Sequence, residues 1–463
     1  MLLVRNIRLP LSCPDPDAEA AAQALHILRV PAHKAARCGV AKLSVDARHG
    51  KPVLVYTMAI TLKDEGEESA YAGASPCVCF TQPARFSFSV GDTALKTRPV
   101  VVGLGPAGLF AALLLARSGF RPLVLERGPE LDERVKAVEH FEKTGELNLN
   151  ANIQFGEGGA GTFSDGKLTT RVGDPLCAFV TDAFLQHGAP ADIAWRQKPH
   201  VGTDLLRGII RSIRQEIIAL GGEVRFNTAL TGLKIENGAL AGVETTAGDF
   251  ACEQLILAVG HSARDTFAML HGSGLPLECK PFSVGFRAEH LQTEIDKSLY
   301  HAAAGHPVLP VGEYQLSQHV SGGRCVYTFC MCPGGQVVAS ASETGHVVTN
   351  GMSYHARDGK NANAAVVVSV GAEDFAGDPR RAIAFQRELE AKAYAAGRRG
   401  GAYAAPAENV QSFLEGKGQL NIGRVEPTYD RGVVAADLGA LLPGELADTL
   451  RAGLRAYEHK IAG

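Results

Sequence analysis

The sequence has no long hydrophobic run and almost no net charge. Its most apolar stretch is residues 109–116, whereas a membrane-spanning helix needs roughly 18 or more apolar residues. Arg5 and Arg8 interrupt the apolar residues at the start, which argues against a secretory signal peptide. Lysine and arginine number 46 against 49 aspartate and glutamate residues, so no overall field attracts nucleic acid or an anionic membrane. We therefore expect a cytoplasmic protein without a membrane partner.

Cysteine is also sparse. Ten cysteines in 463 residues are too few for a disulfide scaffold and are typical of a reducing compartment. Cys77 and Cys79 are separated by one residue, as are Cys330 and Cys332, a spacing shorter than that of zinc-binding pairs. We therefore expect no metal site. Cys330 and Cys332 could exchange electrons as dithiol and disulfide, but their apolar flanks favour buried thiols that pack as small hydrophobic side chains.

Glycine, by contrast, is abundant. It accounts for 52 of 463 residues, which exceeds the usual share of roughly 7%. Glycine is needed where the backbone turns sharply or approaches another group closely. An excess of this kind is typical of a chain that surrounds a large ligand.

A three-glycine motif lies between an apolar strand and a helix. The segment 103–108 reads Gly-Leu-Gly-Pro-Ala-Gly and follows Val100-Val-Val102. The first glycine of such a motif permits a tight turn, the second lets the backbone reach a pyrophosphate, and the third lets the helix pack on the strand. The exposed N–H groups at the helix start bind the anion. The candidate ligand-binding residues here are Gly103, Gly105, Pro106, Ala107 and Gly108.

An acidic residue completes the motif. Glu126 follows the next predicted strand, 122–125, and lies eighteen positions after Gly108. A carboxylate at this place accepts hydrogen bonds from ribose hydroxyls and repels a 2′-phosphate. The motif therefore predicts FAD or NAD rather than NADP, and we include the neighbouring Arg127 in the site.

Longer motifs resemble a known family. The chain is similar over almost its whole length to uncharacterised bacterial FAD-dependent dehydrogenases, NAD(P)/FAD-dependent oxidoreductases among the flavoproteins built like glutathione reductase. The segments that carry the resemblance are Asn152–Leu168, Lys198–Asp204, Gly260–Asp265, Lys280–His290, Tyr327–Gly335 and Pro427–Tyr429. The resemblance implies FAD as the cofactor, with NAD(P)H as a candidate transient reductant. Only one three-glycine motif is present, so a separate nicotinamide domain is not expected.

The resemblance also implies further cofactor contacts. The glycine-rich loop 156–166 would lie along the ribityl chain, pyrophosphate and flavin ring, and an apolar strand ending near residue 259 would pass close to the nucleotide. Three histidines lie in the matching segments, but we assign no catalytic acid or base. The implied contacts are Arg134, Asn152, Gly159, Thr162, Ser164, Lys167, Ala229, Leu230, Gly260 and His261.

We expect an α/β fold in four segments. Residues 1–97 would form a small N-terminal α/β domain of ferredoxin-like type with a linker, because the pattern reads strand, helix, strand, strand. Residues 98–279 would form a Rossmann-type FAD domain with a β-meander, and residues 280–412 a β-rich substrate or cap lobe. Residues 413–463 would return to the FAD domain and leave it incomplete.

The expected function is two-electron or hydride transfer between an unknown organic substrate and the flavin, with a small-molecule substrate as partner and an undetermined oligomeric state. Two alternatives stay open. One is a non-catalytic nucleotide-binding fragment. The other is a flavoprotein acting on RNA through Lys42, Arg48 and Lys51, which the near-neutral charge disfavours.

Members of the similar family continue past the point where this chain stops, and the added segment carries a further flavin-contacting motif. The resemblance therefore predicts that the chain is truncated at Gly463. It also predicts weaker FAD binding without that motif.

Overall fold

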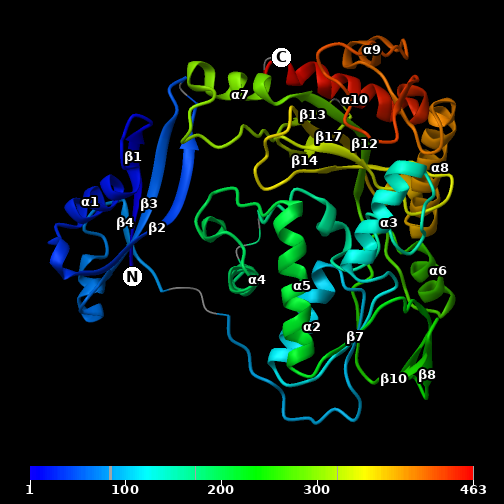
Figure 1. The fold of residues 1–463 in the computed structure, drawn as a ribbon, viewed down its shortest axis with the longest axis horizontal. Helices are drawn as coiled ribbons and strands as arrows, with labels where there is room; N and C mark the ends of the chain where they lie inside the picture. The colour runs from blue at the N-terminus through cyan, green and yellow to red at the C-terminus, as the bar shows by residue number, and fades with distance from the viewer. Residues whose placement is uncertain (49, 83–85, 171, 173, 321, 462–463) are drawn as a thin grey trace. The chain divides into compact units, whose positions relative to one another are not determined.

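A computed structural model describes residues 1–48, 50–82, 86–170, 172, 174–320 and 322–461. Gly463 lies outside the described residues. The chain divides into two compact units (Figure 1). The first comprises 1–89, 167–201 and 293–312, and the second comprises 90–166, 202–292 and 313–463. This division differs from the four predicted segments, because 167–201 and 293–312 belong with the N-terminal residues.

The first unit is built on an antiparallel sheet in the order β2-β3-β1-β4. Alternate residues of β3 are buried, which gives the sheet one apolar face, and α1 packs against this face. The order is that of the ferredoxin-like fold, with the 3-10 segment η2 in place of the second helix. The elements are β1 (Leu2–Pro10), α1 (Pro16–Leu28), η1 (Ala32–Lys34), β2 (Ala35–Asp46), β3 (Val53–Leu62), η2 (Glu65–Tyr71) and β4 (Val78–Phe80).

Later segments complete this unit. Gln197 N donates to Leu43 O, and Leu43 N donates to Trp195 O, so residues 195–197 add a short parallel stretch to the edge of β2. At the end of the same strand Asp46 accepts bonds from both Arg8 and Arg48, which compensates part of the basic charge that an RNA surface would use. The further elements are α4 (Leu176–Gln186), η4 (Ala191–Ala194), α7 (Gln292–Tyr300) and η5 (His301–Ala303).

The second unit begins with a parallel sheet in the order β11-β5-β6-β7. The strands β5 and β6 are fully buried, and α2 and α5 pack together beside them. An antiparallel meander, β8-β9-β10, follows β7 as the sequence predicts. The elements are β5 (Val100–Val102), α2 (Pro106–Arg117), β6 (Leu123–Leu125), α3 (Leu131–Thr144), η3 (Gly159–Phe163), α5 (Thr203–Ala219), β7 (Glu223–Arg225), β8 (Leu230–Glu236), β9 (Ala239–Thr245), β10 (Gly248–Ala251), β11 (Leu255–Leu257) and α6 (Arg264–Gly272).

A second sheet of this unit is antiparallel, with the order β12-β17-β14-β13. Helices α8, α9 and α10 lie beside this sheet (Figure 1). Their apolar side chains and one face of the sheet form a separate core. The elements are β12 (Phe282–Leu291), β13 (Ser317–His319), β14 (Cys325–Cys332), β15 (Gln336–Ala339), β16 (Thr349–Met352), β17 (Asn361–Val370), η6 (Ala372–Phe375), α8 (Pro379–Gly397), η7 (Arg398–Gly400), β18 (Ala405–Ala407), α9 (Val410–Glu415), β19 (Val433–Ala435), η8 (Gly439–Leu441) and α10 (Gly444–Tyr457).

None of the described helices is both long and apolar enough to cross a bilayer. No group of three or more histidine, cysteine, aspartate or glutamate side chains in the described part of the chain is placed to hold a metal ion.

Candidate nucleotide-binding site

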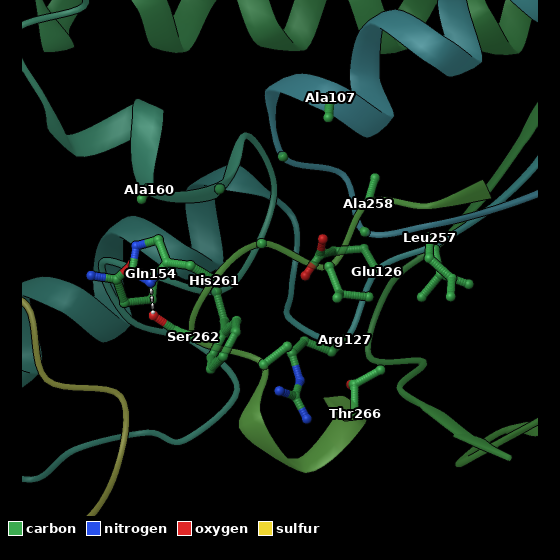
Figure 2. A pocket seen from close by; sticks show the side chains of 18 of the residues that line it. Ala107, Glu126, Arg127, Gln154, Ala160, Leu257, Ala258, His261, Ser262 and Thr266 are labelled. Atoms are coloured by element: carbon green, nitrogen blue, oxygen red, sulfur yellow. Dashed lines mark hydrogen bonds between the residues drawn. The ribbon is translucent and has the colours of Figure 1, made fainter. Parts of the chain in front are cut away.

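A cavity of about 480 Å³ opens at the carboxyl ends of the parallel strands in the second unit. Ligands of open α/β sheets bind at this edge. Figure 2 shows side chains from several segments around the cavity. The lining residues are Val102, Gly103, Gly105, Pro106, Ala107, Leu125, Glu126, Arg127, Gln154, Phe155, Gly156, Gly159, Ala160, Gly161, Thr228, Leu230, Leu257, Ala258, Val259, Gly260, His261, Ser262, Ala263, Thr266 and Phe267.

The glycine turn forms one wall of the cavity. Gly103 has a φ of +96°, which favours glycine, and a Cβ there would overlap the carbonyl oxygen of Ala258. A Cβ on Gly108 would overlap the carbonyl oxygen of Gly103, so this glycine allows the helix to pack closely. Helix α2 starts at Pro106, and no side chain caps it. Its first N–H groups are therefore available to an anion.

Glu126 is held by the main chain around it. The side chain is almost completely buried, and its carboxylate accepts bonds from Leu104 N (2.7 Å), Gly128 N (2.9 Å) and Gly156 N (3.2 Å). A carboxylate has about four acceptor positions. Three are used by the protein, so about one strong position is left for a ligand hydroxyl.

The glycine-rich loop forms a second wall. A Cβ on Gly159 would lie 2.9 Å from the Cα of Gly105, so the loop backbone passes directly over the glycine turn. Gly159 and Gly156 both have positive φ angles, +58° and +112°. A side chain on Gly159 would overlap the glycine turn, and one on Gly156 would overlap Arg134, so both positions need glycine for the close packing of this loop.

Arg134 shapes this loop from inside. The side chain is completely buried, and its guanidinium donates to the carbonyl oxygens of Asn152, Ile153, Gly156 and Glu157 at 2.5–3.3 Å. Burial lowers the pKa of Arg134 to about 9, so the group remains charged at neutral pH. The sequence-based expectation placed Arg134 at the cofactor, whereas the structure places it behind the cavity wall.

Many of the residues predicted to bind the cofactor line the cavity. They come from five separate segments that the fold brings together, which local sequence patterns alone do not show. The predicted residues that line the cavity are Gly103, Gly105, Pro106, Ala107, Glu126, Arg127, Gly159, Leu230, Gly260 and His261.

The other predicted residues lie outside the lining. Asn152 and Thr162 are buried and form bonds within the loop, Asn152 to the N–H groups of Gln154 and Phe155, and Thr162 to Glu157 O. Ser164 closes a local turn. The remaining three are Gly108, which packs on Gly103; Ala229, beside the lining residues; and Lys167, which belongs to the first unit.

Several lining residues were not singled out from the sequence. Gln154 and Phe155 lie inside the recognised motif, but only the structure shows that they line the cavity. Figure 2 shows the side chain of Gln154 there. Thr266 and Phe267 come from the first turns of α6. A signal for them exists in the sequence, since this helix directly follows the apolar strand and its Gly260.

One ion pair and one histidine lie at the cavity. Arg127 forms an ion pair with Asp265 at the start of α6, and its guanidinium lies 4.5 Å from the ring centre of Phe155. The ring of His261 is exposed to the cavity and accepts or donates a bond at 3.0 Å to Ser262 Oγ (Figure 2). Desolvation by the surrounding protein, followed by the positive charge of the nearby Arg264, lowers the pKa of His261. The lower pKa favours a neutral imidazole.

Comparison with known proteins identifies the family. An uncharacterised protein of Clostridium beijerinckii is 48% identical over 379 residues, which cover 81% of this chain and 71% of that protein. The family described as "FAD-dependent protein, C-terminal domain-like" matches residues 281–463, and the family described as "FAD dependent oxidoreductase" matches residues 207–343. The chain belongs to a family of FAD-dependent oxidoreductases.

More distant similarities are also present. Digeranylgeranylglycerophospholipid reductase 1 of Methanococcoides burtonii is 28% identical over 46% of this chain and 49% of its own length. Among solved structures, glycine oxidase from Bacillus cereus is 11% identical, with a TM-score of 0.27 over 59% of this chain and 73% of that chain. The chain therefore spans about half the length of this reductase, and the TM-score is too low to support any transfer of activity.

The cavity fits the cofactor of the family. FAD presents a pyrophosphate, a ribose and a flat ring system, and these need anion-binding N–H groups, a carboxylate and space between backbones. The start of α2, Glu126 and the cavity that Gly105 and Gly159 line provide them. The residues that would hold the cofactor therefore belong to the first turn of α2, the end of β6 and the glycine-rich loop.

Proposed function

We propose that this chain transfers two electrons, as a hydride, between a small organic substrate and bound FAD. The observation that carries the proposal is the pairing of the uncapped start of α2 with buried Glu126 on neighbouring parallel strands. This arrangement binds a dinucleotide without a 2′-phosphate. When bound, the flavin supplies the redox chemistry, as in other cofactor enzymes.

The side chains of the protein have binding and positioning roles in this proposal. Glu126 would accept a bond from the adenine ribose, and the α2 N–H groups would hold the pyrophosphate. Arg134 fixes the backbone of the loop that forms one wall of the cavity. His261 is a candidate proton donor or acceptor at the cavity wall. The lowered pKa keeps the ring neutral, so its free nitrogen can accept a proton, as a weaker base than an unperturbed imidazole.

The first test is FAD affinity of the Glu126→Gln variant. The amide NH₂ would face main-chain N–H groups that now donate to a carboxylate, so we expect FAD to bind at least about tenfold more weakly. Glu236→Gln, an exposed change on β8, serves as the control. Fluorescence titration with FAD measures both affinities. Equal affinity of Glu126→Gln and the unchanged chain would contradict the proposal.

The second test concerns the reaction. Anaerobic titration of the FAD-loaded chain with NADH and NADPH shows whether either nicotinamide reduces the flavin, and a subsequent oxidant shows turnover. A bleached flavin that is reoxidised by an organic acceptor supports the proposal. A bound flavin that dithionite reduces but that no nicotinamide or organic substrate reduces would favour the non-catalytic alternative.

A further inference from the structure

The second sheet has one face that the helices leave open. Side chains such as Phe286, Val326 and Val368 point into the core with α8 and α10. Residues directly opposite one another in neighbouring strands present their side chains on the same face. Arg287 pairs with Ala365, and Ala365 pairs with Phe329. These three residues therefore form one row across β12, β17 and β14, on the face opposite the core.

The row has a distinctive chemistry. Phe329 is 62% exposed, although it lies in the middle of a strand. Ala365, which lies between the two larger side chains, is small. Gly285, two residues before Arg287, has no side chain, so little side-chain volume covers this part of the sheet. The exposed ring of Phe329, at the other end of this row from Arg287, provides an apolar contact surface for a ligand.

Arg287 carries a charge that no carboxylate compensates among the described residues. Its Nη1 donates to Asn363 Oδ1 (2.6 Å) and Cys330 O (3.3 Å), and its Nη2 donates to Asn350 Oδ1 at 3.3 Å. All three acceptors are neutral. A partly buried guanidinium is ordinarily paired with an anion, so this one has the capacity to bind an anionic ligand.

The edge of the guanidinium that recognises carboxylates is the least occupied. Arg287 Nε is buried and has no hydrogen-bond partner within the described part of the chain, and Nη2 has one long bond. Nε and Nη2 form the two-pronged edge that binds a carboxylate through two parallel hydrogen bonds. Nearby, Asn363 is completely buried and its Nδ2 also lacks a described partner. All of these unused groups are donors, which favours a ligand group made only of acceptors.

We propose that this sheet face binds the substrate, and that the substrate is a small organic carboxylate with an apolar body. Arg287 binds the carboxylate, and Ala365 and Phe329 contact the apolar part. The inference rests on the proposed function, because it names the substrate class of the same enzyme. The site is connected to the nucleotide cavity through β16 and β15. Asn350 on β16 pairs with Val338 on β15, and Ser340 just beyond β15 accepts a bond from the cavity residue Gln154.

Calorimetric titration of the FAD-loaded chain with three probes tests the site. Phenylacetate offers the charge and the ring, phenylacetamide keeps the ring without the charge, and acetate keeps the charge without the ring. We expect phenylacetate to bind at least tenfold more tightly than either of the others. Equal binding of phenylacetate and phenylacetamide would overturn the proposal, and this comparison needs no mutation.

Variants locate the binding. Arg287→Met is expected to weaken phenylacetate binding at least tenfold, Arg287→Lys to weaken it less, and Phe329→Ala to weaken it severalfold. Arg380→Met is the matched control, because Arg380 is exposed and paired with Asp378 at the start of α8. If Arg287→Met does not fold, the exposed Phe329→Ala variant and the probe comparison decide. Unchanged binding in Arg287→Met and Phe329→Ala would overturn the site.

The design separates this inference from the proposed function. A chain that holds FAD but does not bind phenylacetate overturns the carboxylate site and leaves the flavoprotein proposal intact. A chain that holds no FAD overturns the flavoprotein proposal, whatever its affinity for phenylacetate.

Discussion

Single residues of this chain combine structural and binding roles in ways that their positions in the sequence only partly reveal. Glu126 was predicted as a ribose ligand, and its carboxylate also joins the glycine turn to the loop through three main-chain N–H groups. Arg134 was predicted near the cofactor, and its donors instead serve four carbonyl oxygens of the loop. Pattern reasoning identifies charged residues beside a motif, but it does not show which groups they meet.

The Arg134→Lys variant tests the role of the buried guanidinium. A lysine has one nitrogen and cannot reach four separate carbonyl oxygens, so several buried acceptors would lose their donors. We expect the free energy of unfolding to fall by about 3 kcal/mol and the loop to bind FAD poorly. Urea unfolding measures the loss. Arg211→Lys, whose guanidinium pairs with Asp132 on the surface, should stay within about 0.5 kcal/mol of the unchanged chain.

Glu142 on α3 predicts a pH dependence of stability. Burial, followed by the nearby Asp430 and Glu139, raises the pKa of Glu142 to about 7. The unfolded chain releases this proton near its ordinary pKa of 4.5, so the stabilising contribution is complete below that value and is lost as pH rises through 7. In Glu142→Gln, which mimics the protonated form, the decline in unfolding free energy between pH 5 and pH 8 should be smaller. Parallel pH curves for both chains would contradict this assignment.

At the scale of elements, the predictions were best where hydrophobic periodicity was regular. The strand, helix, strand, strand order at the start of the chain and the strand–turn–helix around Gly103 both occur where the sequence predicts them. The meander after β7 is also present. Irregular segments were harder, because their conformation depends on distant partners. Residues 195–197 join the edge of β2 through bonds to Leu43, and no local pattern indicates this pairing.

The ion pair between the end of β6 and the start of α6 yields a prediction about cofactor release. Arg127 and Thr266 line the cavity, and the ion pair with Asp265 holds the Arg127 side chain in this wall. Asp265 is more than half exposed, so the pair is weak. We expect Asp265→Asn to raise the FAD dissociation rate about two- to fivefold, and added salt to accelerate release from the unchanged chain more than from the variant.

A suitable control for this experiment is Asp249→Asn, which removes an exposed ion pair with Lys234 in the meander. Stopped-flow release of FAD into excess competing apoprotein measures the rates. If Asp265→Asn and Asp249→Asn release FAD equally fast, the pair has no role in retention.

At the scale of the whole molecule, the family, the α/β fold class and the FAD cofactor were predicted from motifs and are confirmed by the comparisons. The domain limits and the individual site residues stay predictions. The interleaving of 167–201 and 293–312 with the N-terminal unit was not predictable from composition, because these segments contain no boundary signal and are recruited by contacts distant in sequence.

The central claim is that the cavity around Gly105, Glu126 and Gly159 binds FAD. The most direct measurement is the amount of FAD released by denaturing the purified chain after it has been saturated with FAD and passed through gel filtration. The account predicts close to one FAD per chain, with the visible absorption of oxidised flavin before denaturation. A folded chain that neither retains nor takes up FAD would contradict it.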